Sequence, residues 1–221
     1  MRTCGRKTTP VMHLTCRGQT WKSLERLITR WKRLRVQRVL ALRGDAFRPR
    51  NDGPNSSVEL VAFLTEHGMK TAVAAYPDGH PDARKAAHEM SETHWLYRKL
   101  EAGADQIVTQ FSARIDGVLR LRDAVERFGE PVEMRVGVMP VPDWERFKTL
   151  IDRCGIEPDP GEALLFDGLP DDSHHALSLG LAYANMRALR AEGCTSFHLY
   201  GLNDSRLLLP LIRSLQSLDR P

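Results

Sequence analysis

The stretch Arg38-Val39-Leu40-Ala41-Leu42-Arg43-Gly44-Asp45 carries the clearest indication of fold class in this chain. Its apolar part, residues 39–42, is short enough for a β-strand and too uniformly apolar for a strand with one face in water. Such a strand is typical of a parallel sheet that helices cover on both faces. The charged and glycine-containing residues that follow it then lie at its carboxyl end, where α/β folds and (β/α) barrels bind their ligands.

Short apolar runs alternate with segments of helical periodicity along the rest of the chain. We expect strands at residues 11–15, 38–42, 71–75, 106–110, 133–138 and 196–200. We expect helices after Thr20, from Ser56 or Ser57 to 66, and at 82–102, 115–128, 143–153, 174–192 and 205–218, with an irregular Pro- and Gly-rich piece between 153 and 174. This alternation predicts a parallel sheet with helices outside it, in one domain over residues 1–221.

Polar residues follow almost every predicted strand. They are His13, Thr15, Arg43, Asp45, Tyr76, His80, Gln110 and Asn203. A ring of polar groups from successive strands suits the mouth of a barrel better than the single crevice of an open sheet, although periodicity alone does not separate the two. Each residue taken singly is more often structural than functional. Gly44-Asp45, for example, is also a common turn dipeptide.

The composition is that of a globular protein, with 42% apolar and 27% charged residues. No run approaches the roughly 20 apolar residues of a membrane span, and the first ten residues lack the apolar region of a secretory signal. The four cysteines are scattered, without a CxxC pair, which is typical of reduced thiols. We therefore expect a cytoplasmic protein without a membrane partner.

The formal net charge is +4, and the Arg and Lys residues are concentrated between Lys22 and Arg50. This concentration is compatible with nucleic acid, with an anionic small molecule or with a solvated helix face. No nucleic-acid-binding motif accompanies it, so we expect no nucleic-acid partner. His174 and His175 lack a third ligand at suitable spacing and are interpreted as solvated residues at the start of a helix, so no metal site is expected.

Several strand-end motifs occur in a fixed order. Examples are Ala41-Leu42-Arg43-Gly44-Asp45 and Val73-Ala74-Ala75-Tyr76-Pro77-Asp78-Gly79-His80-Pro81, and the others span residues 10–16, 98–105, 108–111, 137–141, 165–169 and 197–203. In order and spacing, over nearly the whole chain, they resemble the methylenetetrahydrofolate reductase family. The resemblance implies a (β/α)8 TIM-type barrel that binds FAD and reduces 5,10-methylenetetrahydrofolate to 5-methyltetrahydrofolate with NADH or NADPH, in the one-carbon metabolism that supplies methionine.

The resemblance also implies roles for individual residues. Around the flavin it places His13, Arg43, Gly44, Asp45, Tyr76, His80, Ala83, Arg98 and Lys99. Arg98 and Lys99 are suited to neutralising the pyrophosphate, and Asp45 acts electrostatically near the flavin ring. For the folate substrate it implies contacts with Gln110, Tyr200 and Arg206.

The chain also departs from the family pattern. The match begins at the family's third strand, so we expect about six strand–helix units, without the first strand that bears the general-acid glutamate. Glu92 and Trp95 replace an Asp and an Asn on the long helix, residues 111–114 replace an aromatic run ending in Asp, and Asp204 replaces an arginine that contacts folate. Flavin binding is thus better supported than folate reduction. The alternative is a non-catalytic relative that binds flavin or a partner protein.

The predicted barrel has consequences for the outer strands. Strands 11–15 and 196–200 become open edges, which expose backbone donors and apolar surface. We therefore expect a homo-oligomer, or a partner that covers the open barrel edge.

Overall fold

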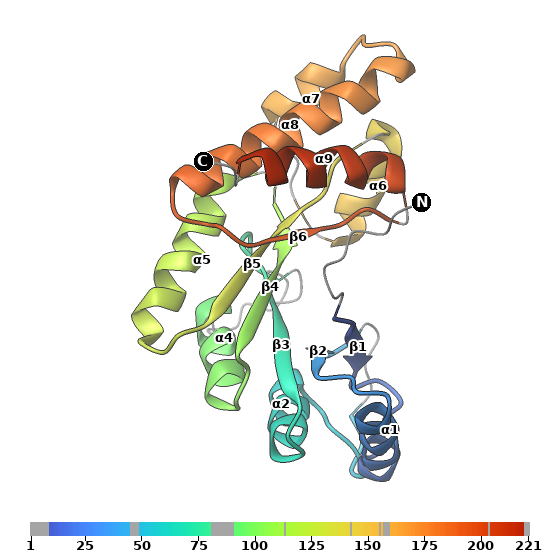
Figure 1. Cartoon of the computed structure of the whole chain (residues 1–221), viewed down its shortest axis with the longest axis vertical. Helices are drawn as coiled ribbons and strands as arrows, with labels where there is room; N and C mark the ends of the chain where they lie inside the picture. Colours follow the sequence, from blue (N-terminus) through green and yellow to red (C-terminus); the bar gives the residue numbers. More distant parts are fainter. Residues whose placement is uncertain are drawn as a thin grey trace. The chain divides into compact units, whose positions relative to one another are not determined.

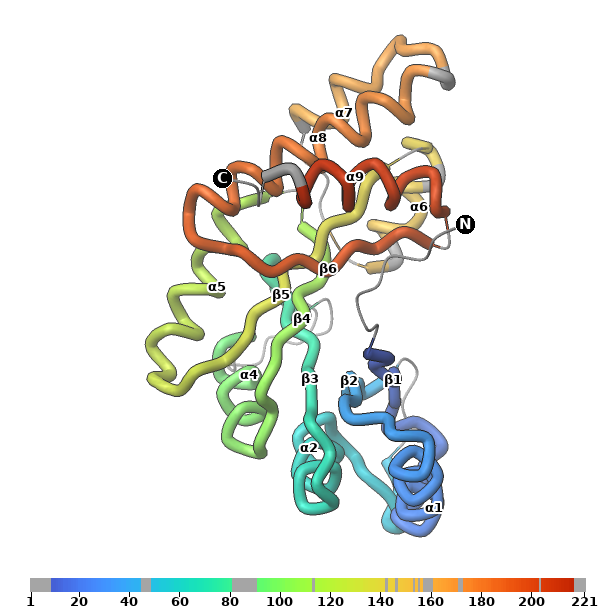
Figure 2. Tube along the Cα trace, in the orientation of Figure 1, coloured from blue at the N-terminus to red at the C-terminus, as the bar shows by residue number. Residues whose placement is uncertain are grey.

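The computed structural model describes residues 9–44, 49–80, 91–112, 114–141, 143–154, 156, 160–202 and 204–218. The chain divides into two compact units. Unit 1 draws on Met1–Ala74 and His94–Ile107, and unit 2 on Ala75–Thr93 and Val108–Pro221. Figure 1 labels the helices and strands, and Figure 2 follows their alternation along the chain.

Unit 1 contains three strands whose hydrogen-bonded order is that of the sequence, β1 (Val11–Thr15), β2 (Arg38–Leu42) and β3 (Lys70–Ala75). Both pairings are parallel, with His13 opposite Leu40 and Leu40 opposite Ala72. The middle of β2 is buried, as expected for a strand covered on both faces.

Two helices of unit 1 begin directly after residues whose side chains cap them. Thr20 and Ser23 form a reciprocal capping box at the start of α1 (Trp21–Arg33), and the Ser56 hydroxyl accepts from the backbone N–H of Glu59 at the start of α2 (Ser57–Glu66). α4 (Glu92–Glu101) follows β3. The inward face of α1 consists of Leu24, Ile28 and Trp31, spaced as an amphipathic helix requires.

Unit 2 contains β5 (Glu133–Val138) and β6 (Phe197–Leu199), which pair in parallel, and most of β4 (Gln106–Phe111). Its helices are α5 (Ile115–Phe128), α6 (Trp144–Cys154), α7 (Pro160–Phe166), α8 (Asp171–Ala191) and α9 (Ser205–Leu218). Val136 packs with Val118 and Leu189, whereas Val138 packs with Met186 and Leu211. The strands therefore present one face to α5, α8 and α9.

The predicted α/β fold class of a (β/α) barrel type is confirmed. Strands alternate with helices, and the strand order β1 to β6 follows the sequence. Three predicted features are wrong. Ser91 is not helical, so the helix predicted over 82–102 does not run unbroken through the described residues. The piece predicted as irregular contains α7, which has Pro160 at its first position, where proline is favoured. His174 is only partly solvated, because its Nε2 atom is buried and its ring meets Phe166 edge-on at 5.3 Å.

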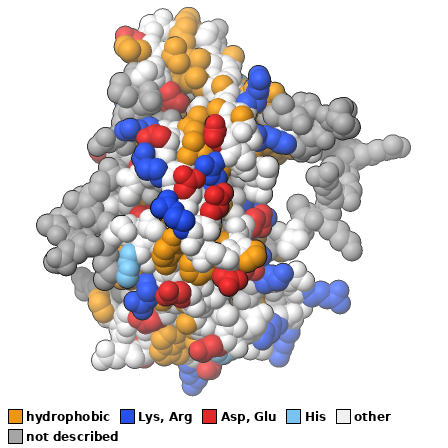
Figure 3. Space-filling view, turned by 90° about the vertical axis from the view of Figure 1, so that its left-hand side faces the viewer, with side chains coloured by type: hydrophobic (Ala, Val, Ile, Leu, Met, Phe, Trp, Pro, Cys, Tyr) orange, Lys and Arg blue, Asp and Glu red, His pale blue; other side chains and the backbone are white. Residues whose placement is uncertain are grey.

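Charged and apolar side chains both reach the surface. Figure 3 shows Lys and Arg interspersed with Asp, Glu and apolar side chains on the face that it presents. None of the helices in the described ranges has both the length and the apolar character needed to cross a bilayer.

An ion pair links two segments of unit 1 that are far apart in sequence. The guanidinium of Arg38 on β2 donates through both terminal nitrogens to the two carboxylate oxygens of Asp105, which immediately precedes β4. The Asp105 backbone N–H donates to the Thr71 carbonyl at 3.0 Å, so β3 lies between the partners. The Arg38 side chain is only 17% exposed. A two-pronged pair with one buried partner contributes more than an exposed pair.

We expect Asp105→Asn to lower the free energy of unfolding by about 1–2 kcal/mol, because a largely buried guanidinium loses its counter-charge. Urea titration followed by circular dichroism measures the change. The matched control is Asp52→Asn, which breaks the exposed pair with Arg50 and should leave stability unchanged within error. Equal effects in the two variants would contradict the structural importance of the Arg38 pair.

Candidate functional site

The strand β1 and the end of β2 carry the first group of predicted flavin residues. His13 on β1 and Arg43 after β2 are exposed. Gly44 has φ +88°, and a Cβ there would lie 3.1 Å from the Cβ of Thr15. Glycine is required at this turn both for its left-handed backbone and for the close approach of the two strand ends. Asp45, Ala83 and Asn203 lie outside the described residues.

The end of β3 carries a second group. The rings of Tyr76 and His80 meet edge to face with centroids 4.5 Å apart, so these two predicted flavin residues do lie together. Glu92, in the first turn of α4, accepts a hydrogen bond from the Tyr76 backbone N–H at 3.2 Å. This bond holds the start of α4 against the carboxyl end of β3, where a (β/α) fold binds its ligands.

Arg98 and Lys99 are adjacent on α4 but lie in different environments. Arg98 is exposed and makes no side-chain hydrogen bond or ion pair within the described ranges. Lys99 is only 8% exposed, and its Nζ donates to the Ala74 carbonyl on β3 at 2.9 Å. Neighbours in a helix point in directions about 100° apart, which explains the difference. Arg98 is therefore available to an anion, whereas Lys99 already stabilises the packing of the helix.

Thr109 on β4 organises the residues predicted to contact folate. Its hydroxyl accepts from the Gly137 backbone N–H at 2.8 Å and donates to the Gln110 carbonyl at 2.9 Å. Its own carbonyl accepts from the Tyr200 hydroxyl at 3.0 Å. The structure thus brings Gln110 and Tyr200 together around a residue that our sequence analysis did not single out. The available signal was a hydroxyl residue directly after the buried apolar residues Ile107 and Val108.

Tyr200, a predicted folate contact, and Asp204, beside the predicted contact Arg206, have pKa values that differ from the usual ones. Burial, with a smaller contribution from Tyr76, raises the pKa of Tyr200 to about 12, so its hydroxyl stays protonated at neutral pH. Arg206 binds Asp204 through its guanidinium at 3.0 Å and lowers the pKa of that carboxyl. Because Arg206 is already paired, it reaches an anionic ligand only in competition with Asp204.

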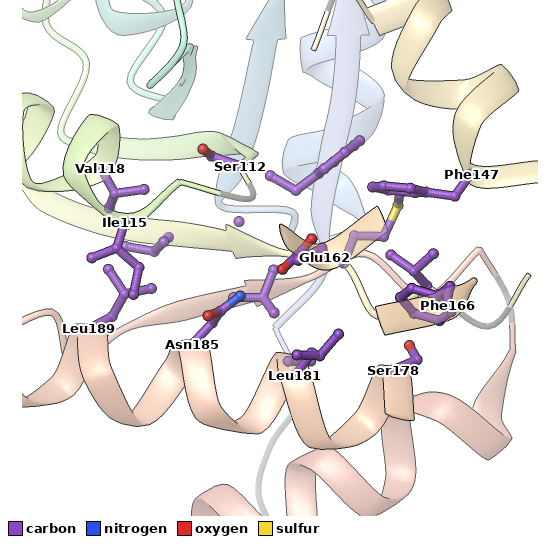
Figure 4. A pocket seen from close by; sticks show the side chains of 17 residues that line it. Ser112, Ile115, Val118, Phe147, Glu162, Phe166, Ser178, Leu181, Asn185 and Leu189 are labelled. Atoms are coloured by element: carbon purple, nitrogen blue, oxygen red, sulfur yellow. The ribbon is translucent and has the colours of Figure 1, made fainter. Parts of the chain in front are cut away.

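Unit 2 also contains a cavity of about 40 Å³ between the strands and α5 to α8 (Figure 4). It is mainly apolar, with Ser112, Glu162, Ser178 and Asn185 as polar lining residues. The buried Ser178 hydroxyl has no hydrogen-bond partner within the described residues. The volume suits one water molecule and is far too small for a flavin. None of the predicted flavin residues lines this cavity.

At Gly137, β4, β5 and the Tyr200 side chain approach one another closely. A substitution at this position therefore tests the packing. A Cβ at Gly137 would collide with the Thr109 carbonyl oxygen and lie 2.8 Å from Cε2 of Tyr200. We expect Gly137→Ala to destabilise the fold by about 1–3 kcal/mol in urea unfolding. The control is Gly180→Ala on α8, where a Cβ meets nothing within 4 Å. That change should stabilise the helix by about 0.5–1 kcal/mol, and a harmless Gly137→Ala would refute the packing described here.

Comparison with known proteins agrees with this geometry. The family model described as methylenetetrahydrofolate reductase matches residues 4–216. The 5,10-methylenetetrahydrofolate reductase of Escherichia coli K12 is 31% identical over 207 residues, which cover 92% of this chain and 69% of that protein. The corresponding protein of Buchnera aphidicola subsp. Baizongia pistaciae is 29% identical over 210 residues, covering 94% of this chain and 70% of that one.

A solved structure of an uncharacterized protein from Clostridium thermocellum, described as binding two copies of 5-methyl-5,6,7,8-tetrahydrofolic acid, has a TM-score of 0.58. It is 10% identical and covers 94% of this chain and 72% of that one, so it supports the fold. The sequence matches extend over nearly the whole length of the present chain. The chain therefore belongs to the methylenetetrahydrofolate reductase family.

Proposed function

We propose that this chain binds FAD and acts as an NAD(P)H-dependent oxidoreductase on folate, with 5,10-methylenetetrahydrofolate as substrate. One observation carries the flavin part of the proposal. α4 is held at the carboxyl end of β3 by the bond between Glu92 and the Tyr76 N–H, and it presents Arg98, which is exposed and makes no side-chain hydrogen bond or ion pair within the described residues. A cation held beside a strand-end site is suited to a phosphate group.

The described residues fit a flavin dinucleotide in three respects. Arg98 is free to bind the pyrophosphate. Gly44 allows the left-handed backbone turn at the carboxyl end of β2, the end at which parallel α/β folds bind their ligands. The Tyr76–His80 pair offers an aromatic surface at the end of β3. Bound flavin supplies the two-electron chemistry that connects a nicotinamide donor to a folate acceptor.

Lys99 has a supporting role in this proposal. Its ammonium is committed to the Ala74 carbonyl, so it supports the packing of α4 on β3 without having to touch the phosphate. His13, exposed on β1, and Arg43, exposed directly after β2, complete the proposed flavin contacts.

On the folate side, Gln110, Tyr200 and Arg206 are the proposed contacts. Tyr200 offers its ring, because its hydroxyl already donates to Thr109, and the Gln110 side-chain oxygen accepts from the Phe111 N–H at 3.2 Å. The amide nitrogen of Gln110 remains suitable as a donor to a pterin. A tetrahydrofolate ligand also agrees with the one described for the Clostridium structure.

Proton delivery is the weak point of the proposed reaction. Opening the methylene bridge of the substrate needs an acid placed to protonate the departing nitrogen. Asp204 is poorly suited, because Arg206 lowers its pKa, and Tyr200 is poorly suited, because its pKa is raised to about 12. Glu92 remains as a candidate donor, although its carboxylate accepts the Tyr76 N–H.

We expect the purified chain, supplied with FAD, to oxidise NADH or NADPH with menadione as acceptor. Reduction of methylenetetrahydrofolate should be slower by about 100-fold or more, since a positioned acid contributes about 10²–10⁴ in rate. Absorbance at the nicotinamide band follows the first reaction, and chromatography of 5-methyltetrahydrofolate follows the second. Equal rates would show that a proton donor is present, and Glu92→Gln and Asp204→Asn would locate it. Bound FAD without either turnover would favour the non-catalytic alternative.

We expect Arg98→Ala to weaken FAD binding by about 1–3 kcal/mol while leaving the unfolding midpoint unchanged, because the guanidinium is exposed and unpaired. Lys99→Ala should lower the unfolding midpoint as well, because it leaves the Ala74 carbonyl without its partner. Arg26→Ala, which removes an exposed cation from α1, is the charge-matched control. FAD affinity that is the same in Arg98→Ala and in the unmodified chain would contradict the assignment of this residue.

A cytoplasmic location, self-association through the open outer strands and a role in supplying methionine are further parts of the same proposal. A partner at the outer strands is tested most directly by measuring mass in solution as a function of protein concentration.

A further inference from the structure

Thr109 is a polar residue that the fold buries completely within β4. Its exposed fraction is 0%, and it immediately precedes Gln110 in the sequence. Its hydroxyl is used in both directions, because it accepts from the Gly137 backbone N–H on β5 at 2.8 Å and donates to the Gln110 carbonyl at 2.9 Å. A hydroxyl carries one donor, so these bonds leave no donor for a ligand. The side chain therefore ties the carboxyl half of β4 to β5.

The main chain of Thr109 holds a second partner, Tyr200, which follows β6. The Tyr200 hydroxyl donates to the Thr109 carbonyl at 3.0 Å. The Tyr200 ring makes edge contacts with Phe111 and His198, with centroids 5.8 Å and 4.5 Å apart. The hydroxyl bond and the two ring contacts together fix the direction of the ring. The position of the Thr109 carbonyl thus decides where the Tyr200 ring points.

Gly137 makes this arrangement sensitive to the spacing of the strands. A Cβ at Gly137 would collide with the Thr109 carbonyl oxygen and lie 2.8 Å from Cε2 of Tyr200. The main chain of β5 therefore touches both the acceptor and the ring that bonds to it. Packed interiors leave little free space, so a displacement of β5 against β4 is passed on to the ring. All of these residues belong to unit 2.

We propose that Thr109 is a positioning residue of the folate site, whose buried hydroxyl sets the spacing of β4 and β5 and thereby orients the Tyr200 ring toward the ligand. The hydroxyl acts at a distance, because its burial and its two bonds keep it from touching a ligand. The inference rests on the proposed function where it names folate, and it deepens that proposal by explaining what directs one of the contacts. A purely structural hydroxyl, in contrast, would stabilise the sheet without changing ligand affinity.

The test compares Thr109→Val, which removes the hydroxyl at nearly constant shape, with Thr109→Ser, which keeps it. The dissociation constant of 5-methyltetrahydrofolate, measured by calorimetric titration of the full chain, should rise about three- to ten-fold in Thr109→Val, the range for one lost hydrogen bond, and less than about two-fold in Thr109→Ser. Tyr200→Phe completes a double-mutant cycle. In that background Thr109→Val should have little further effect, because the bond through which it acts has gone. Unchanged affinity in Thr109→Val, or fully additive effects of the two substitutions, would overturn the inference.

A second measurement needs no ligand and separates the inference from the proposed function. Fluorine NMR of a fluorotyrosine-labelled chain reports on the Tyr200 ring, whose resonance is the one missing from Tyr200→Phe. That resonance should shift in Thr109→Val and keep its position in Thr109→Ser, whereas an unshifted resonance in Thr109→Val would refute the positioning role. If the unmodified chain binds no 5-methyltetrahydrofolate but the resonance shifts, the folate part of the proposed function fails and the positioning of Tyr200 by Thr109 stands. Thr109→Cys, whose thiol is a weaker hydrogen-bonding group, replaces Thr109→Val if that variant does not fold, and should give smaller changes in the same direction.

Discussion

The hydrogen bond from the Lys99 ammonium to the Ala74 carbonyl is the interaction on which the arrangement of the proposed cofactor residues depends. An ammonium that is 8% exposed must have an acceptor, because an unpaired buried charge is strongly destabilising. The structure buries Lys99 by placing α4 against β3. With that face fixed, the adjacent Arg98 has to point outward, and Glu92 reaches the N–H that follows the strand. One buried cation thus determines which other side chains of the helix are available to a ligand.

The sequence predicted the elements that local chemistry determines. β1, β2, β5, α5 and α9 begin and end where the apolar runs and helical periods place them. Thr20 and Ser56 cap their helices because their hydroxyls satisfy the first free N–H groups. The wrong predictions fall where packing between distant parts of the chain, rather than local sequence, determines the structure. α7 lies in a Pro- and Gly-rich piece, and packing of Phe166 against Trp144 and in the core with Phe147 gives it a stability that its composition does not indicate.

The candidate site was less predictable than the fold, because residue type does not reveal what a side chain is already bonded to. Arg98 and Lys99 are both cations in one motif, yet within the described residues only the Arg98 side chain lacks a bonding partner. A signal was present in the spacing: Lys99 is three residues from Leu96 and adjacent to Leu100, both of which are buried, so it shares their inward face. Thr109 and Gly137 could not be paired from sequence, since their contact depends on which strands become neighbours. The close Tyr76–His80 contact, in contrast, follows from a short loop at one strand end.

The folate side shows how the same surroundings can suit binding and oppose proton transfer. A general acid works best with a pKa near the operating pH. Burial moves the pKa of Tyr200 up to about 12, while the Arg206 guanidinium moves that of Asp204 down, so both groups leave the useful range in opposite directions. Each shift also serves structure: the protonated phenol donates to Thr109, and the ionised carboxylate holds Arg206. Changing either pKa toward neutrality would require removing a contact that orders the site. Delivering the proton from an additional acidic residue is therefore easier than shifting the pKa of Tyr200 or Asp204 toward neutrality.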